Sequence, residues 1–246
     1  MPVFFVSADQ IRDKTATITG PLLTHLRSSL RVQVGERLRL TDPQRRRLMI
    51  EVTSVDRHQL LGQVLSAEVG PWPQAPRLIL GQALLKGEHM DWVIQKATEL
   101  GVDAIVPLIS QHVIVRPRDA RIPSQVERWR RIALEAAQQS ERWDVPTIAH
   151  PCRFSQWLET ESIAACRVIM LERGGQQALQ TIPFPTGPHA RIVIGIGPEG
   201  GWREEEGTEA LAKGFLPVRL GQRILRAETA ALAALSVIQS RQGELG

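Results

Sequence analysis

Two stretches late in the sequence decide the fold, and they read Gly195-Ile-Gly-Pro-Glu-Gly-Gly201 and Leu220-Gly-Gln-Arg-Ile-Leu-Arg-Ala-Glu-Thr-Ala230. Each is a glycine turn between an apolar run typical of a strand and a stretch typical of a helix. In α/β folds such turns lie at the carboxyl edge of a parallel sheet, where exposed backbone N–H and C=O groups bind nucleotide-like ligands. The two turns therefore predict a ligand pocket built almost wholly from loops.

The region around these turns alternates between short apolar runs and helical stretches. This alternation predicts a parallel sheet with helices on both faces. The last helical stretch is apolar around much of its surface, so we expect it to be buried, in the protein or against a second subunit. The predicted strands are Leu78–Leu84, Ala104–Leu108, Arg167–Leu171, Arg191–Ile196 and Leu216–Leu220. The predicted helices are Met90–Leu100, Ser124–Ser140, Arg203–Lys213 and Ile224–Ser240.

The segment Gly70-Pro-Trp-Pro-Gln-Ala-Pro76 separates this region from the preceding one, because prolines at this density favour an extended linker. The N-terminal part contains short strand-like runs, interrupted by a helical turn or two at Leu22–Leu30. Many short strands at close spacing predict a small β-barrel. The strand-like runs are Pro2–Val6, Thr15–Thr19, Arg37–Thr41, Leu48–Val55 and Leu60–Glu68.

The composition is that of a globular protein: 43% of the 246 residues are apolar, and no apolar run is long enough to span a bilayer. The N-terminus lacks the features of a signal peptide, so we expect a cytoplasmic protein. Arginine outnumbers lysine 26 to 4, and Arg45, Arg46 and Arg47 are adjacent. Arginine suits an RNA partner, although a compositional bias of the genome explains the excess equally well.

The two cysteines, Cys152 and Cys166, have no neighbouring cysteine or histidine in a metal-ligand pattern. We therefore expect two reduced thiols and no metal site. Thiol catalysis is the lesser alternative.

The letters Gly195-Ile-Gly-Pro-Glu-Gly200 also match the G-x-G-x-x-G fingerprint of dinucleotide-binding proteins. Pro198 removes an N–H that would face a pyrophosphate. The next predicted strand ends without the acid that binds a ribose, and the motif does not open the α/β region. Arg219 would suit a 2′-phosphate, so an NADP site remains a lesser alternative.

Five segments together carry a family resemblance, in the right order and along nearly the whole chain. They are His25-Leu-Arg-Ser-Ser-Leu-Arg-Val-Gln-Val-Gly35, Lys86-Gly-Glu-His-Met-Asp-Trp-Val-Ile-Gln-Lys-Ala-Thr-Glu-Leu-Gly101, the stretch from Arg128-Trp to Glu135-Ala-Ala-Gln-Gln-Ser140, Ile196-Gly-Pro-Glu-Gly-Gly201 and Leu220–Ala230. These segments resemble the RsmE family of 16S ribosomal RNA uridine-N3 methyltransferases.

The resemblance implies a PUA-like RNA-binding β-barrel over residues 1–72, followed by a SPOUT α/β domain over residues 73–246. In such a domain the C-terminal segment threads through a loop and forms a deep trefoil knot. The resemblance also implies that the cofactor is S-adenosylmethionine, that the enzyme is a homodimer and that the substrate is 16S rRNA, expected within the 30S subunit.

Three loops should form the cofactor pocket. Their apolar residues offer a slot for adenine, and their glycines allow close backbone approach, although turn geometry alone accounts for any single glycine equally well. The cofactor-binding residues implied in this way are Leu171, Glu172, Ile196, Gly197, Gly200, Leu220, Gly221, Ile224 and Leu225.

The reaction requires that uridine N3 lose its proton before it attacks the methyl group. The site therefore needs a base, or a cation that stabilises the uracil anion. Arg226 is the candidate for holding the uracil or its phosphate, and Glu228 and Glu199 are candidate bases or orienting groups. Glu228 would equally suit the positive end of the last helix. The candidate RNA-binding residues are His25, Arg27, Arg31, Lys86 and Lys96.

Several positions depart from the family pattern. Val3 or Phe4 stands where members commonly have arginine, and Pro43–Arg47 where they carry a glycine-rich turn. His89 replaces a usual arginine, and Glu141 a usual glycine. These changes bear on how the barrel grips RNA more than on the reaction. The rival functions are an NADP-dependent oxidoreductase and a non-catalytic RNA-binding protein.

Overall fold

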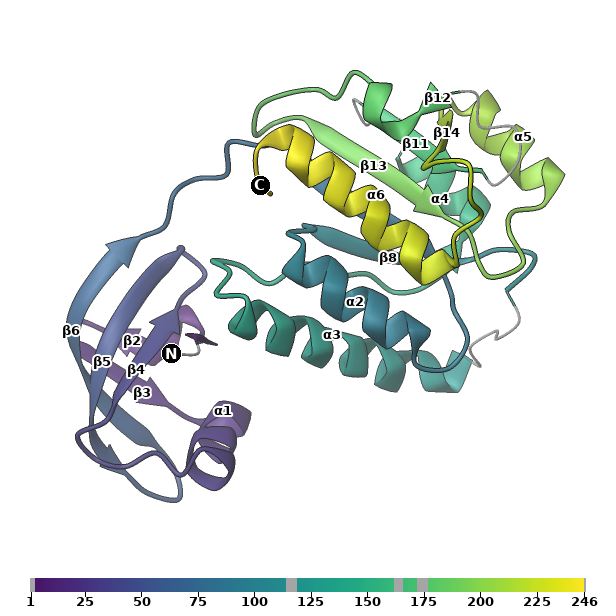
Figure 1. Ribbon diagram of the computed structural model, residues 1–246. Helices are drawn as coiled ribbons and strands as arrows, with labels where there is room; N and C mark the ends of the chain where they lie inside the picture. Colours follow the sequence, from purple (N-terminus) through teal and green to yellow (C-terminus); the bar gives the residue numbers. More distant parts are fainter. Residues whose placement is uncertain (1–2, 114–118, 162–165, 172–176, 246) are drawn as a thin grey trace. The chain divides into compact units, whose positions relative to one another are not determined.

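The computed structural model describes residues 3–113, 119–161, 166–171 and 177–245, which fold into two compact units (Figure 1). The N-terminal unit comprises Met1–Trp72 and Ala137–Asp144, and the C-terminal unit comprises Pro73–Ala136 and Val145–Gly246. Within the described residues, no helix is both long and apolar enough to cross a membrane.

The N-terminal unit is built on a six-stranded sheet with the order β1-β4-β5-β6-β3-β2, antiparallel except for the parallel pair β1–β4. Leu48, Ile50 and Val52 alternate along one strand and are all buried, as expected for a sheet with one face on a core. The strands are β1 (Val3–Phe5), β2 (Ile11–Arg12), β3 (Thr15–Ile18), β4 (Arg37–Thr41), β5 (Arg46–Val55) and β6 (Leu60–Val69). The short helix α1 (Gly20–Thr24) continues into a π-helical turn at His25–Ser29.

The adjacent arginines of the N-terminal unit are engaged by acidic or carbonyl groups. Arg45 Nη1 lies 2.5 Å from Oδ2 of Asp144, and Arg46 Nη2 lies 2.7 Å from Oδ2 of Asp42. The guanidinium of Arg47 stacks 3.7 Å from the centroid of the Trp143 ring. These arginines therefore hold residues 141–144 against the sheet, which is a structural use that the sequence alone did not indicate.

Two positions where glycine is usual in the resembled family adopt left-handed backbone conformations. Arg45 has φ 59° and Glu141 has φ 53°, a region in which a side chain is disfavoured. Glu141 makes an ion pair with Arg39, at 2.5 Å between Oε1 and Nη2. Val3 and Phe4, where arginine is usual, are buried in the core.

The C-terminal unit contains a parallel sheet with the order β10-β8-β7-β13-β11-β14-β12, and β9 pairs with β8. The strands are β7 (Arg77–Ala83), β8 (Ala104–Ile109), β9 (Thr147–Ile148), β10 (Cys152–Arg153), β11 (Cys166–Met170), β12 (Gln177–Ala178), β13 (Arg191–Ile196) and β14 (Leu216–Arg219). The helices are α2 (His89–Glu99), α3 (Ile122–Gln139), α4 (Phe154–Thr160), α5 (Glu204–Ala212) and α6 (Ala227–Gln242).

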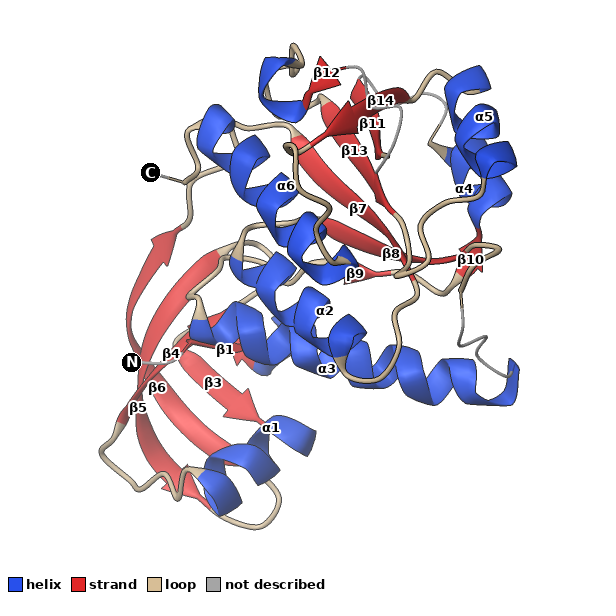
Figure 2. Ribbon diagram, turned by 45° about the vertical axis from the view of Figure 1, so that its right-hand side comes forward, coloured by secondary structure: helices blue, strands red, loops and turns tan. Residues whose placement is uncertain are grey.

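Successive residues of the central strands face two separate cores. Leu78 and Leu80 pack in a cluster with α2, α3 and α6, whereas Ile79 between them packs with α4 and α5. Figure 2 shows α2 and α6 on one face of the sheet and α4 and α5 on the other. The prediction of a parallel sheet covered on both faces is thus confirmed.

The last helix begins later than predicted. The sequence placed its start at Ile224, but α6 begins at Ala227. Arg226 is its N-cap residue, with an extended backbone at φ −62° and ψ 152°. Ile224 and Leu225 therefore belong to a loop, where their side chains are available to a cavity.

Candidate active site

A cavity of about 1680 Å³ lies where β11, β13 and β14 end and where α2 and α6 begin. We call it the loop cavity, because most of its wall comes from the segments 196–202 and 219–226. The carboxyl ends of neighbouring parallel strands meet at one edge of the sheet, so loops distant in sequence converge there. The predicted loop-built pocket is thus present in the structure.

The predicted cofactor-binding residues converge on this cavity. Glu172 lies outside the described residues. The other eight all line the loop cavity: Leu171, Ile196, Gly197, Gly200, Leu220, Gly221, Ile224 and Leu225. Ile224 is 65% exposed, an unusual state for isoleucine that marks the rim as available for contact.

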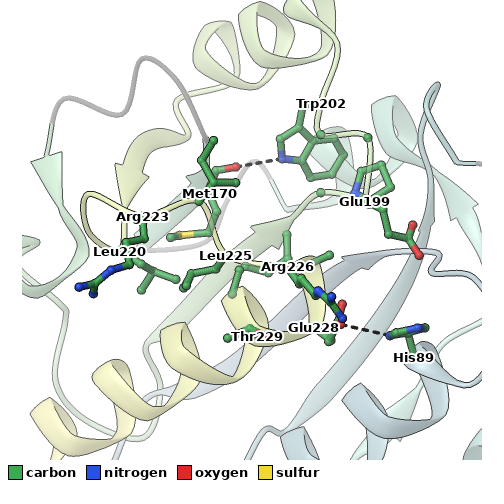
Figure 3. Close-up of a pocket in the computed structure, with 18 of the residues that line it drawn as sticks. His89, Met170, Glu199, Trp202, Leu220, Arg223, Leu225, Arg226, Glu228 and Thr229 are labelled. Atoms are coloured by element: carbon green, nitrogen blue, oxygen red, sulfur yellow. Dashed lines mark hydrogen bonds and ion pairs between the residues drawn. The ribbon is translucent and has the colours of Figure 1, made fainter.

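Trp202 fixes two of the loops relative to each other, and the sequence analysis missed it. Its indole Nε1 donates a hydrogen bond of 3.1 Å to the carbonyl oxygen of Met170 at the end of β11 (Figure 3). A Cβ atom added at Gly197 would lie 3.2 Å from the same Nε1. Gly197 therefore gives the indole the space that it occupies. Trp92 was expected to be a packing residue, but it lines the cavity and is exposed.

The predicted catalytic residues lie at the same cavity, and Figure 3 shows Arg226 and Glu228 across it from Met170, Leu220 and Leu225. Glu228 is 9% exposed, and its Oε1 lies 3.2 Å from Nδ1 of His89.

Oε1 of Glu199 accepts a hydrogen bond of 2.9 Å from the backbone N–H of Lys86, which ties the segment before α2 to the segment after β13. The cavity thus combines an apolar side with side chains of both charges.

The candidate RNA-binding residues do not lie together. His25, Arg27 and Arg31 are in the N-terminal unit, whereas Lys86 lines the loop cavity. Lys96 pairs with Glu99, at 2.8 Å between Nζ and Oε1, and is not among the residues that line the cavity.

The cysteines lie away from the loop cavity. Cys166 is buried and Cys152 half-buried, and both are free thiols. Burial raises the pKa of each thiol, which disfavours the reactive thiolate. Among the described residues, no group of three or more His, Cys, Asp and Glu side chains is arranged to hold a metal ion.

The fold and the cavity place the chain among the α/β RNA methyltransferases, since the family described as RNA methyltransferase domain matches residues 73–239. Ribosomal RNA small subunit methyltransferase E of Synechocystis is 36% identical over 244 residues, covering 96% of this chain and 76% of the relative. The Bacillus subtilis protein of the same name is 32% identical over 240 residues, covering 94% of this chain and 91% of its own length.

Solved structures agree with this placement. Ribosomal RNA small subunit methyltransferase E from Neisseria gonorrhoeae, bound to S-adenosylmethionine, matches with a TM-score of 0.86, 31% identity and 98% coverage of each chain. A Legionella pneumophila methyltransferase in complex with the same cofactor matches with a TM-score of 0.88, 28% identity and 97% coverage of each chain. The chain belongs to the ribosomal RNA small subunit methyltransferase E family, which confirms the resemblance.

Proposed function

We propose that the chain transfers a methyl group from S-adenosylmethionine to N3 of a uridine in 16S ribosomal RNA. The loop cavity carries this proposal, because it gathers the predicted cofactor and catalytic residues in a family whose solved members hold that cofactor. Its volume of about 1680 Å³ exceeds the roughly 300–1000 Å³ of a typical small-molecule site. A methyl donor and an unstacked base therefore fit together.

The cavity wall suits the cofactor. Leu171, Ile196, Leu220, Ile224 and Leu225 supply apolar surface for an adenine ring, and the turns supply backbone donors and acceptors for its edge. A Cβ atom added at Gly221 would meet nothing within 4 Å, so the space beside this backbone is open to a ligand. Gly197 and Gly200 complete the proposed set, together with Glu172. The bound cofactor supplies a methyl group on a positively charged sulfur.

The charged side of the cavity suits the uracil. Arg226 would stabilise the negative charge that uracil gains when N3 loses its proton. Glu228 would take part in moving that proton, with His89 beside it. Glu199 holds the Lys86 amide, so we assign it an orienting role.

We further infer that residues 1–72 form a PUA-like RNA-binding barrel and residues 73–246 a SPOUT domain with a trefoil knot. The placement of β14 between β11 and β12 supports a C-terminal segment that returns through the sheet region. His25, Arg27 and Arg31 in the barrel, with Lys86 and Lys96, would contact 16S rRNA within the 30S subunit. A cytoplasmic homodimer follows from the family.

Two measurements test the proposal. Calorimetric titration should show micromolar-range binding of S-adenosylhomocysteine and none of NADP; the opposite result would establish the oxidoreductase. Mass-spectrometric mapping of 16S rRNA from a deletion strain should show one 3-methyluridine missing and restored by the wild-type gene. Arg226→Ala should lower kcat by about 10²- to 10³-fold, the scale of a lost charge-stabilising donor. Unchanged modification by Arg226→Ala would favour a non-catalytic RNA-binding role.

A further inference from the structure

The segment after β8 braces the cavity loop from behind. Nδ1 of His112 lies 3.1 Å from the carbonyl oxygen of Gly200 and 3.2 Å from that of Gly201. Nε of Arg203 donates a hydrogen bond of 3.3 Å to Nε2 of His112. Among the described residues that line the loop cavity, Gly200 and Gly201 are included and His112 is not. His112 therefore acts on the cavity through the loop.

The hydrogen-bond partners define the protonation state of His112. A guanidinium can only donate, so Nε2 must accept. A carbonyl oxygen can only accept, so Nδ1 must carry the hydrogen. The brace thus requires the neutral imidazole with its proton on Nδ1, and Arg203 enforces this form.

Glu206 gives the same two segments a second connection. Its side chain is only 5% exposed, with Oε1 accepting from Gln111 N–H at 2.9 Å and Oε2 from Arg203 N–H at 3.0 Å. This carboxylate anchors the backbone on both sides of His112 and Arg203. The ring of His112 is then held against the glycines: a Cβ added at Gly200 would lie 3.3 Å from Cβ of His112.

We propose that His112 is a positioning residue, which keeps the Gly200–Gly201 turn in the conformation that binds the cofactor and does so only when neutral. The inference rests on the proposed function for the identity of the ligand. A second proton would place an Nε2–H donor opposite the Arg203 donor and set two positive charges side by side. Among the described residues, Arg203 and Glu206 are the charged groups of this brace, and Glu199 and Lys86 meet the other end of the turn. Affinity for the cofactor therefore falls as the pH drops through the range in which imidazole gains a proton.

The test compares calorimetric binding of S-adenosylhomocysteine at about pH 8 and about pH 5.5, on either side of the imidazole titration. Wild type should lose about three- to tenfold in affinity at the lower pH, the scale of one hydrogen bond. His112→Asn keeps an N–H donor near the position of Nδ1 but does not titrate, so it should bind like wild type at the higher pH and lose less at the lower. His112→Leu should bind about three- to tenfold more weakly at the higher pH.

Steady-state kinetics provide the second measurement. His112→Leu should raise KM for the methyl donor while kcat at saturation changes little, because His112 does not touch the reacting atoms. His150→Gln is the matched control, since His150 is exposed and outside the set that lines the loop cavity. If His112→Leu fails to fold, the loss of pH dependence in His112→Asn decides.

Two results would overturn the inference: wild-type affinity in His112→Leu at the higher pH, or an unchanged acid loss in His112→Asn. A wild-type protein that binds no S-adenosylhomocysteine at either pH would instead overturn the proposed function.

Discussion

Nδ1 of His89, the first residue of α2, lies 3.2 Å from Oε1 of Glu228 in the first turn of α6 (Figure 3). The positive end of α6 favours a carboxylate at this position, and the same carboxylate lines the loop cavity. The two roles considered for Glu228, at the helix start and in the site, are therefore compatible. His89 is half-exposed, so its charge responds to solvent pH.

We expect His89→Ala to lower kcat about tenfold, because the carboxylate of Glu228 loses the partner that orients it, a loss of roughly 1.5 kcal/mol. Affinity for S-adenosylhomocysteine should stay within about twofold of wild type, well under 1 kcal/mol. His89→Arg keeps a cation beside Glu228 at every pH and should retain activity up to about pH 9. Methylation rates measured between about pH 6 and pH 9 check this. Equal loss in His89→Arg and His89→Ala would show that charge at this position is irrelevant.

The glycines of the cavity separate ligand contact from turn geometry. Gly197→Ala would place a Cβ 3.2 Å from the Trp202 indole, so we expect a loss of stability of about 1–3 kcal/mol and weaker binding together. A Cβ at Gly221 meets nothing within 4 Å, so Gly221→Ala should leave the melting temperature unchanged. If the cofactor contacts Gly221, affinity should still fall. Thermal denaturation and calorimetry on both variants make the comparison, and unchanged affinity in Gly221→Ala would leave this glycine with turn duty alone.

The N-terminal unit should lose stability in acid through Asp144. Burial raises the pKa of its carboxyl, but Arg142 and Arg45 lower it by more, so the pKa lies below its ordinary value. A carboxylate with a depressed pKa stabilises the fold above its unfolded pKa, and this contribution is lost as the pH falls through the folded pKa. We expect Asp144→Asn to cost less than about 1 kcal/mol at neutral pH, because the carboxylate is 42% exposed.

Urea denaturation at about pH 7 and about pH 3.5 checks the Asp144 prediction, since a depressed pKa lies below about 4. The difference between wild type and Asp144→Asn should shrink at the lower pH. A difference that persisted in acid would mean that packing, and not charge, connects Asp144 to its arginines.

The arginines of the N-terminal unit should divide into two groups. Arg27→Ala combined with Arg31→Ala should weaken 16S rRNA binding, lower the salt dependence by about one counterion per phosphate contact and spare the melting temperature. Arg47→Ala should lower the melting temperature, because Nη2 of Arg47 bonds the carbonyls of Glu141 and Arg142 at 2.9 and 3.2 Å. Filter binding at several salt concentrations, with thermal denaturation, distinguishes the groups. The reverse pattern would make Arg47 the RNA contact.

The sequence sufficed for the main strands and the cavity loops, because apolar runs and glycine turns are local signals. β13 was predicted at its observed bounds, Arg191–Ile196. The two-residue strands β9, β10 and β12 are too short to show periodicity, and they were missed with α4. The start of α6 was misplaced because Ile224 and Leu225 continue its apolar pattern while their backbone lies in a loop.

Contacts between distant residues could not be predicted. Arg45 and Asp144 are 99 positions apart, so nothing local marked Arg45 as a structural residue. Trp202, His89 and His112 likewise acquire their positions only when separate strands are brought to one sheet edge. A single sequence shows the residue types but not which partners the fold gives them.

The pairing of β7 with β13 has a consequence for how the chain is made. Arg77 lies beside Arg191, so the ribosome must release most of the C-terminal unit before β7 meets this neighbour. Until then the apolar run Leu78–Leu80 is left with an unfilled edge, a template for stray strands of other molecules. Closing so long a loop is slow. The newborn polypeptide thus passes through a vulnerable interval whose length is set by translation.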